Sequence, residues 1–323
     1  MMLRKFLLVL VLFISVFADA QKMSEADKKL IEKIEDTLAP FAKQMIFDTI
    51  TENRFYADSV FTKALVRALK LPYSFYYHFD SIITVSIQYP ADSTFRIFTW
   101  QLERDEAYFR QHGAIQMNTK DGSLKLFPLI DKSDIARNPT DSVRDNLNWI
   151  GGIYYGLVTK EFKGKKYYTL FGYDDNDIIS TKKWLDVLTF TDDGKPQFGG
   201  RFFDYANDSI KPLQPAYRFC LEYKKDAHAR MVYDEDIDMI IFDHLISESN
   251  EPQKRFTLIP DGDYEAFKWS AGKWVHVDKL FNQKTPNGQY PVPEPLYDDN
   301  GNANEKVLQE KTDKNKDKKP PIN

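Results

Sequence analysis

The chain has 323 residues, 42% of them hydrophobic and 15% aromatic, which is enough to bury a full core in one large domain or two small ones. A formal net charge of −4 argues against nucleic acid and anionic lipid as partners, because both require clustered Lys and Arg. The single cysteine, Cys220, excludes an internal disulfide and is predicted to be a buried, small apolar residue.

Residues 1–20 have the layout of a cleaved secretory signal peptide. Arg4 and Lys5 precede an apolar run from Phe6 to Phe17, and small residues end at Ala20. A membrane anchor is the alternative, but a spanning helix needs roughly 20 apolar residues, and neither this run nor any later segment reaches that length. We therefore expect export to the periplasm or the medium, without a membrane span.

Residues 21–72 are predicted to form a helical segment, because their apolar residues recur at a spacing of three and four. Ser24 followed by Asp27 forms the start of a capping box. Pro40 is predicted to end one helix and open the next, and Pro72 to stop the last one. The apolar stripes indicate a face packed on the rest of the protein, with a coiled-coil partner helix as the alternative.

Residues 73–278 change to the period of β-strands. Short runs rich in aromatic and β-branched residues, such as "TFRIFTWQL" and "KYYTLFGY", alternate with turn signals such as "KDGS" and "TDDGKP". Connections are short and crossover helices are missing, which favours antiparallel neighbours. The predicted fold class is mainly β (α+β): a helical segment followed by a large antiparallel meander, arranged as a sandwich or as a blade-like array.

Residues 279–323 form a tail of different composition. A proline-rich piece, "YPVPEPLY", is followed by a run of Lys and Asp with few apolar residues. Such a composition cannot offset the entropy lost on ordering, so the tail is predicted to be largely disordered.

Several ordered blocks carry a resemblance to a known family. They include "NWIGGIYYGLV", "GKKYYTLFGYDDND", "KKWLDVLTF", "MIIFDHL" and "PDGDYEAF", and together they extend over roughly residues 79–274. The chain resembles a family of secreted proteins of Bacteroidota that has no assigned activity. The resemblance implies an envelope or periplasmic location and supplies no catalytic residues.

A second pattern fits such an origin. Bacteroidota O-glycosylate exported proteins at Asp, then Ser or Thr, then an apolar residue, and this tripeptide occurs six times. Ser142 and Ser209 are the favoured modification sites, because both are expected in loops.

The sequence contains no recognisable catalytic motif. Its five histidines are scattered without the spacing of a zinc site, and both the Gly-x-Ser-x-Gly elbow and a phosphate-binding loop are missing. Asp243 and His244 are adjacent on a predicted strand, so their side chains should point to opposite faces. A structural role is favoured for this pair.

The stretch "YDDNDIISTKKW" places three carboxylates close together. Asp174, Asp175 and Asp177 offer the oxygen ligands that calcium prefers, and no other cofactor is predicted. The EF-hand register fails here, however. The alternative is a turn built by Asp and Asn, with Ser180 capping a short helical turn before Trp184.

Two functions remain open. The favoured one is a non-catalytic envelope protein that binds an unknown envelope protein or a glycan through its β domain. The other is an envelope glycan hydrolase that uses dispersed carboxylates, which would require two of them facing one pocket about 5 to 10 Å apart.

Overall fold

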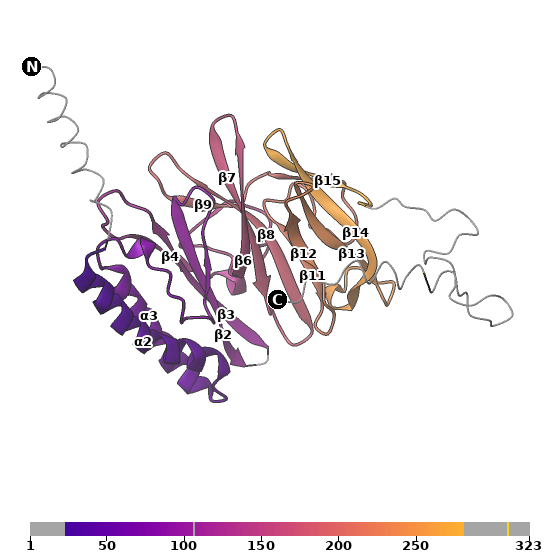
Figure 1. The fold of residues 1–323 in the computed structure, drawn as a ribbon. Helices are drawn as coiled ribbons and strands as arrows, with labels where there is room; N and C mark the ends of the chain where they lie inside the picture. Colours follow the sequence, from indigo (N-terminus) through magenta and orange to yellow (C-terminus); the bar gives the residue numbers. More distant parts are fainter. Residues whose placement is uncertain (1–22, 106, 281–308, 310–323) are drawn as a thin grey trace, which may run out of the picture. The chain divides into compact units, whose positions relative to one another are not determined.

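A computed structural model describes residues 23–105, 107–280 and 309 (Figure 1). The chain divides into a unit of residues 1–280 and a second unit of residues 281–323, and the fold below is that of the first. The predicted signal peptide and nearly all of the predicted tail lie outside the described residues. Within the described part, no helix has both the length and the apolar character needed to cross a membrane.

Two helices form the N-terminal layer, α2 (Glu25–Phe47) and α3 (Thr51–Leu69). The hydroxyl of Ser24 caps α2 by accepting from the Asp27 amide at 3.1 Å, as the sequence predicts. The prediction that Pro40 separates two helices is wrong, because α2 continues through it. Buried residues of α2 recur at helical spacing on both sides of the proline, with Leu38 before it and Ala42 after it. The packing of this face therefore outweighs the loss of the backbone hydrogen bond that Pro40 cannot donate.

The first sheet is a four-stranded antiparallel meander against the helices. Its strands, in spatial order, are β1 (Ser86–Gln88), β2 (Phe95–Asp105), β3 (Tyr108–Met117) and β4 (Lys125–Ile130). Alternate residues of β2 face opposite ways, as the pleat requires. Phe98 and Trp100 pack against the helices, whereas Phe95 and Ile97 face the next sheet.

The second sheet is the middle layer. Its main path runs in the order β5 (Arg144–Asp145), β9 (Pro196–Phe198), β8 (Ser180–Phe190), β7 (Lys165–Asp174) and β6 (Ile153–Phe162). Strand β11 (Phe219–Lys224) also pairs with β8, along residues 180–185. Ser180 therefore begins a strand, and the prediction that it caps a helical turn is wrong.

The third sheet closes the stack. Its order is β10 (Phe203–Asp204), β15 (Lys273–Val277), β14 (Leu258–Ser270), β13 (Met239–Ser247) and β12 (Met231–Asp234). All pairs are antiparallel except β10 with β15, which is parallel. Three short 3₁₀ turns complete the elements: η1 (Ser74–Tyr76), η2 (Ser133–Ile135) and η3 (Arg255–Thr257).

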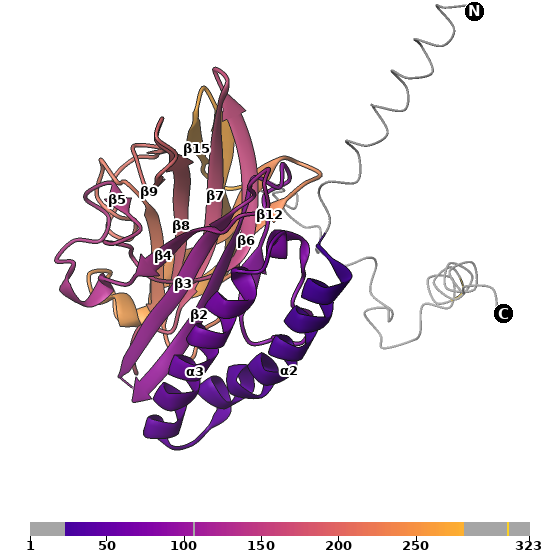
Figure 2. The ribbon, with the colours of Figure 1, turned by 90° about the vertical axis from the view of Figure 1, so that its left-hand side faces the viewer.

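Three apolar cores separate the layers of residues 23–280. The first lies between the helices and the first sheet, the second between the first and middle sheets, and the third between the middle and third sheets. Figure 2 shows α2 and α3 side by side over the first sheet. The sheets are thus stacked face to face as in a sandwich, and the middle sheet is covered on both faces.

Candidate functional site

The site with the most convergent polar groups is a pocket of about 370 Å³, here called the Cys220 pocket. Its floor consists of neighbouring side chains of β8 and β11, namely Lys182 and Trp184 on β8 and Cys220 and Glu222 on β11. Loop residues 138–140 form one wall. Residues 210–213 and Arg255 of η3 form the other wall.

Two cations in this pocket lack a carboxylate partner. Lys182 lies directly opposite Glu222 in the pairing of β8 with β11, yet its ammonium donates to the Asn176 side-chain oxygen at 2.6 Å. Arg255 donates to the carbonyl of Ile210. Among the described residues, no carboxylate lies within ion-pair distance of either cation. Neither positive charge is therefore held in an ion pair there, although the charge of Lys182 acts on Asp174 and opposes the rise of its pKa.

Cys220 and Trp184 also line the pocket. Cys220 is half-buried, so it is less buried than the sequence predicts. Burial raises the pKa of its thiol well above the usual value; Lys182 and Arg255 oppose the shift, whereas Glu222 and Asp174 add to it. The Trp184 side chain is 5% exposed, and its indole Nε1 is buried without a hydrogen-bond acceptor.

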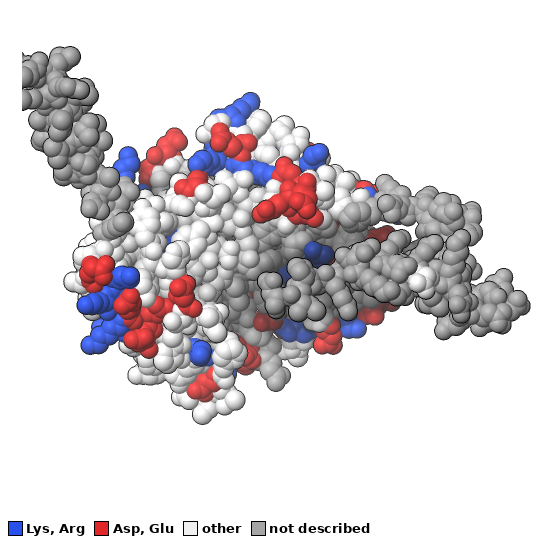
Figure 3. Space-filling model, in the orientation of Figure 1, with Lys and Arg blue, Asp and Glu red and all other residues white. Residues whose placement is uncertain are grey.

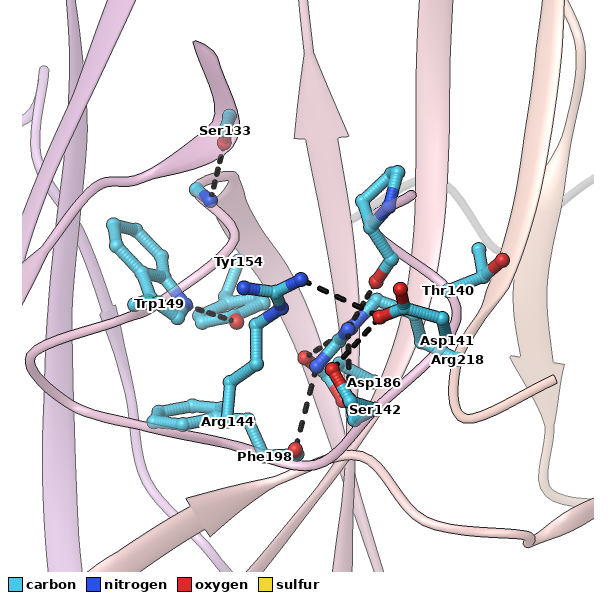
Figure 4. Close-up of polar contacts among 12 residues, drawn as sticks. Ser133, Thr140, Asp141, Ser142, Arg144, Trp149, Tyr154, Asp186, Phe198 and Arg218 are labelled. Carbon is cyan, nitrogen blue, oxygen red and sulfur yellow. Dashed lines mark hydrogen bonds and ion pairs between the residues drawn. The ribbon is translucent and has the colours of Figure 1, made fainter. Parts of the chain in front are cut away.

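The wall formed by residues 138–142 is held by a buried arginine (Figure 4). Arg218 is fully buried and pairs with Asp186 at 3.2 Å. Its remaining donors reach the carbonyls of Pro139 and Ser142 in the wall and the carbonyl of Phe198 on β9. Removal of a charge from such a pair costs about 3 to 5 kcal/mol, so Arg218 fixes the position of the wall.

Burial also affects Asp186, the carboxylate that pairs with Arg218. Loss of solvent raises the pKa of Asp186, although the charge of Arg218 opposes the shift. One of its carboxylate oxygens, Oδ1, has no hydrogen-bond partner among the described residues. The pair is therefore a structural support beneath the pocket and does not face its opening, because neither residue lines the Cys220 pocket.

Ser142 and Ser209 both lie in loops, as expected for modification sites. Ser209 is exposed, whereas Ser142 is half-buried and its hydroxyl donates to Asp141 at 2.7 Å. Of the two, Ser209 presents its hydroxyl more openly to a transferase. Glycosylation at either residue stays a prediction.

The three carboxylates of the calcium hypothesis have separate protein partners. Asp174 is buried and accepts from the Gln111 side chain at 3.0 Å and from the Asn176 amide at 2.9 Å. Burial raises its pKa to about 6. Asp175 pairs with Lys225 at 3.0 Å.

The third member of this group, Asp177, accepts from the backbone amides of Ile179 and Ser180 at 2.9 and 2.8 Å. It therefore closes the turn between β7 and β8 in the manner expected of an Asx-turn. Within residues 23–280, no group of three or more His, Cys, Asp or Glu side chains is arranged to hold a metal ion, and the hydrogen bonds explain the acidic turn without one.

Two histidines that are far apart in the sequence come together around one carboxylate. His276 on β15 and Lys211 both bond to Glu265, and His244 lies 4.0 Å from its other oxygen while it contacts Asp261 at 2.9 Å. Burial opposes ionisation of Glu265, but the bonds from His276 and Lys211 outweigh it, so the pKa of Glu265 is lowered. The sequence did not indicate this cluster, because only the register of β13, β14 and β15 brings its members together.

No protein-family model matches the chain, and no curated protein or solved structure is significantly similar to it.

Proposed function

We propose that the protein is an exported envelope protein that binds an anionic ligand in the Cys220 pocket without cleaving it. The observation that carries the proposal is the presence in one pocket of Lys182 and Arg255, neither of which forms an ion pair with a carboxylate of the described residues. Charged hydrogen bonds to buried or half-buried cations are the stronger kind, so a carboxylate or phosphate would gain most from this arrangement.

An acidic sugar is the ligand class that fits this pocket best. A volume of about 370 Å³ suits a small molecule of one or two rings. The pocket offers an aromatic residue, Trp184, apolar side chains at Ile210 and Leu213, and polar donors, which is the mixture that recognises a sugar ring and a charged substituent together. A glycan of the cell envelope is therefore the proposed partner.

The number of carboxylates that line each pocket favours binding over hydrolysis. The Cys220 pocket has one lining carboxylate, Glu222, and a pocket of about 410 Å³ elsewhere in the described residues also has one, Glu235. A glycosidase requires a pair of carboxyl groups that flank the scissile bond. Release of reducing sugar from envelope glycan by the purified protein would instead support the hydrolase.

The proposed location in the cell envelope is based on the sequence of residues 1–20. The sequence pattern supports a cleaved signal peptide, and the composition of the remaining chain gives no reason to expect nucleic acid as a partner. The family resemblance supports the same compartment. Subcellular fractionation together with sequencing of the mature N-terminus, expected at Gln21, tests the location.

The ligand proposal is tested by calorimetric titration with N-acetylmuramic acid and N-acetylglucosamine, two probes that differ by the lactyl ether that carries the carboxylate of the acid. We expect the acid to bind more tightly, and we expect Lys182→Gln to weaken its binding by about tenfold or more, because a charged hydrogen bond contributes about 1.5 to 3 kcal/mol. The matched control is Lys195→Gln, which changes an exposed lysine in a turn far from the pocket lining. Equal affinity for the two sugars, or an equal effect of the two variants, would contradict the proposal.

A further inference from the structure

Strand β6 forms an exposed edge of the middle sheet. It is ten residues long, pairs with β7 on one side only, and ends the strand order of its sheet. Its first residues are covered by β1 and β2: Ser86 of β1 donates to the carbonyl of Tyr154, and the Thr99 hydroxyl of β2 accepts from the amide of Tyr154. Beyond them, residues 156–162 make no backbone hydrogen bond to any described segment other than β7.

The edges of the other two sheets lie on the same side. Strands β1 and β12 end the orders of the first and third sheets, and Figure 1 shows β6 and β12 beside each other at the front. Two side chains of β6 reach across to β12: Tyr155 donates to the carbonyl of Met231 at 2.9 Å, and Lys160 donates to the Tyr233 hydroxyl at 3.1 Å. Because β1 has three residues and β12 has four, they leave most of the edge of β6 open.

A groove of about 410 Å³, here called the β6 groove, lies along this open edge. It exposes residues 156–159 of β6 and is lined on the other side by Val232 and Tyr233. The hydroxyl of Thr159, within this stretch, is buried and has no hydrogen-bond partner among the described residues. Leu157 packs toward one core and Val158 toward the other, so an added strand would continue a layer that is covered on both faces.

Natural proteins protect exposed strand edges against pairing with other chains. In β6 the protective features lie only at the two ends of the open stretch. A β-bulge at Tyr155 precedes the open stretch, and Lys160 follows it but is already bound to Asp238. Residues 156–159 contain neither a charge nor a proline. An unprotected edge of this kind is a template for strand addition.

The turn beside the groove is acidic. Asp234, Glu235 and Asp236 form no ion pair with any described residue, and Glu235 lines the groove. Figure 3 shows both acidic and basic side chains on the visible part of this side of the molecule, with broad uncharged areas between them. Charge complementarity therefore favours an occupant with basic residues over an acidic or neutral one.

We propose that an extended segment of another protein, with alternating apolar residues and lysines or arginines at its ends, binds in the β6 groove by adding a strand to β6. The backbone hydrogen bonds of residues 156–162 provide the affinity. The acidic turn selects a basic residue at the end of the segment that lies beside it, and alternate side chains enter the spaces above and below the middle sheet. This surface is separate from the Cys220 pocket, with which it shares no lining residue, so the inference does not depend on the ligand proposed there.

The test uses fluorescence polarisation with the intact protein and a labelled peptide of alternating valine and threonine with lysines at both ends. Three further peptides carry glutamates in place of the lysines, N-methyl groups on the odd residues, or N-methyl groups on the even residues. We expect the basic peptide to bind and the acidic one to bind about tenfold or more weakly. Since only alternate amides point to a neighbouring strand, one N-methylated set should abolish binding while the other leaves it nearly unchanged.

A protein variant checks the charge argument independently. The double change Glu235→Gln and Asp236→Asn should weaken the basic peptide several-fold and reduce the salt dependence of binding. Its control, Glu32→Gln with Asp36→Asn, removes two exposed charges from α2. Equal effects of the two N-methylated sets, no binding of the basic peptide at millimolar protein, or dimerisation of the protein that the peptide does not disrupt would each overturn the proposal.

Discussion

Asp174 illustrates at the residue scale how burial changes the chemistry of a side chain. In the sequence it is one of three acids in a turn. In the structure it is 8% exposed, and burial raises its pKa to about 6 even though Gln111 and the Asn176 amide donate to it. A carboxyl group with this pKa is partly protonated in mildly acidic solution, which is unfavourable for a calcium ligand.

This pKa predicts how the stability of the parent depends on pH. Between about pH 4 and pH 6 the folded chain keeps a proton on Asp174 that the unfolded chain has lost, so the free energy of unfolding falls as pH rises through this window. Asp174→Asn retains an oxygen for both donors and removes the titration. We expect the variant to gain stability relative to the parent as pH rises from 4 to 7, by about 1 to 3 kcal/mol in all.

Urea unfolding at a series of pH values measures the difference. The control, Asp236→Asn, changes an exposed aspartate and should stay within about 0.5 kcal/mol of the parent throughout. A constant difference between Asp174→Asn and the parent from pH 4 to pH 7 would contradict the raised pKa.

Other single residues could not be placed from the sequence. Cys220 was expected to be buried, because cysteine is among the most buried residue types, but it is half-buried opposite Trp184 and lines a pocket with Lys182 and Glu222. The contact between Glu265 and His276 depends on the register of β14 with β15, which no local pattern specifies. The prediction that Asp243 and His244 do not meet agrees with the structure, where their partners are Arg230 and Asp261.

At the scale of elements, local patterns predicted the change from helices to strands and most of the long strands. Strands β2, β7 and β8 overlap predicted runs and extend beyond them, because aromatic and β-branched residues alternate there between two cores. The run "IITVSIQY" forms a strand only at Ser86–Gln88. The two errors, at Pro40 and Ser180, share a cause: a local signal was outweighed by the packing of the whole element.

Pro40 gives a prediction at this scale. Its ring removes one hydrogen bond of α2 and crowds the preceding turn, while the buried face of the helix continues past it. We therefore expect Pro40→Ala to stabilise the protein, by about 1 kcal/mol and at most about 3 kcal/mol. Thermal and urea unfolding measure the change.

The comparison for Pro40→Ala is Ala39→Pro in the same turn of α2, which should destabilise the protein because it adds a second proline to the helix interior. A loss of more than about 1 kcal/mol in Pro40→Ala would instead indicate that a bend at Pro40 is needed for α2 to pack on the first sheet.

At the scale of the whole described unit, the order of the layers could not be predicted. The sequence indicates many antiparallel strands, but β11 returns to pair with β8, and β5 pairs with β9, across long separations in the chain. These pairings create the Cys220 pocket, since Lys182 and Glu222 become neighbours only when β11 lies beside β8. The sequence alone therefore does not distinguish a sandwich from a blade-like array, whereas the order of the strands in the sheets does.

The stack also explains why the two proposed binding surfaces are separate. The Cys220 pocket lies where β11 extends the middle sheet beside β8, and the β6 groove lies at the opposite end of the strand order. A ligand in one need not displace a partner in the other.

The most direct test of ligand binding in the Cys220 pocket uses the only cysteine of the chain as a reporter. The rate at which N-ethylmaleimide alkylates Cys220 is measured by mass spectrometry with and without saturating N-acetylmuramic acid, and with N-acetylglucosamine at the same concentration. The acid is predicted to slow alkylation several-fold in the parent and to have no such effect in Lys182→Gln. An alkylation rate that stays unchanged while calorimetry shows the acid to be bound would place the ligand elsewhere and contradict the account.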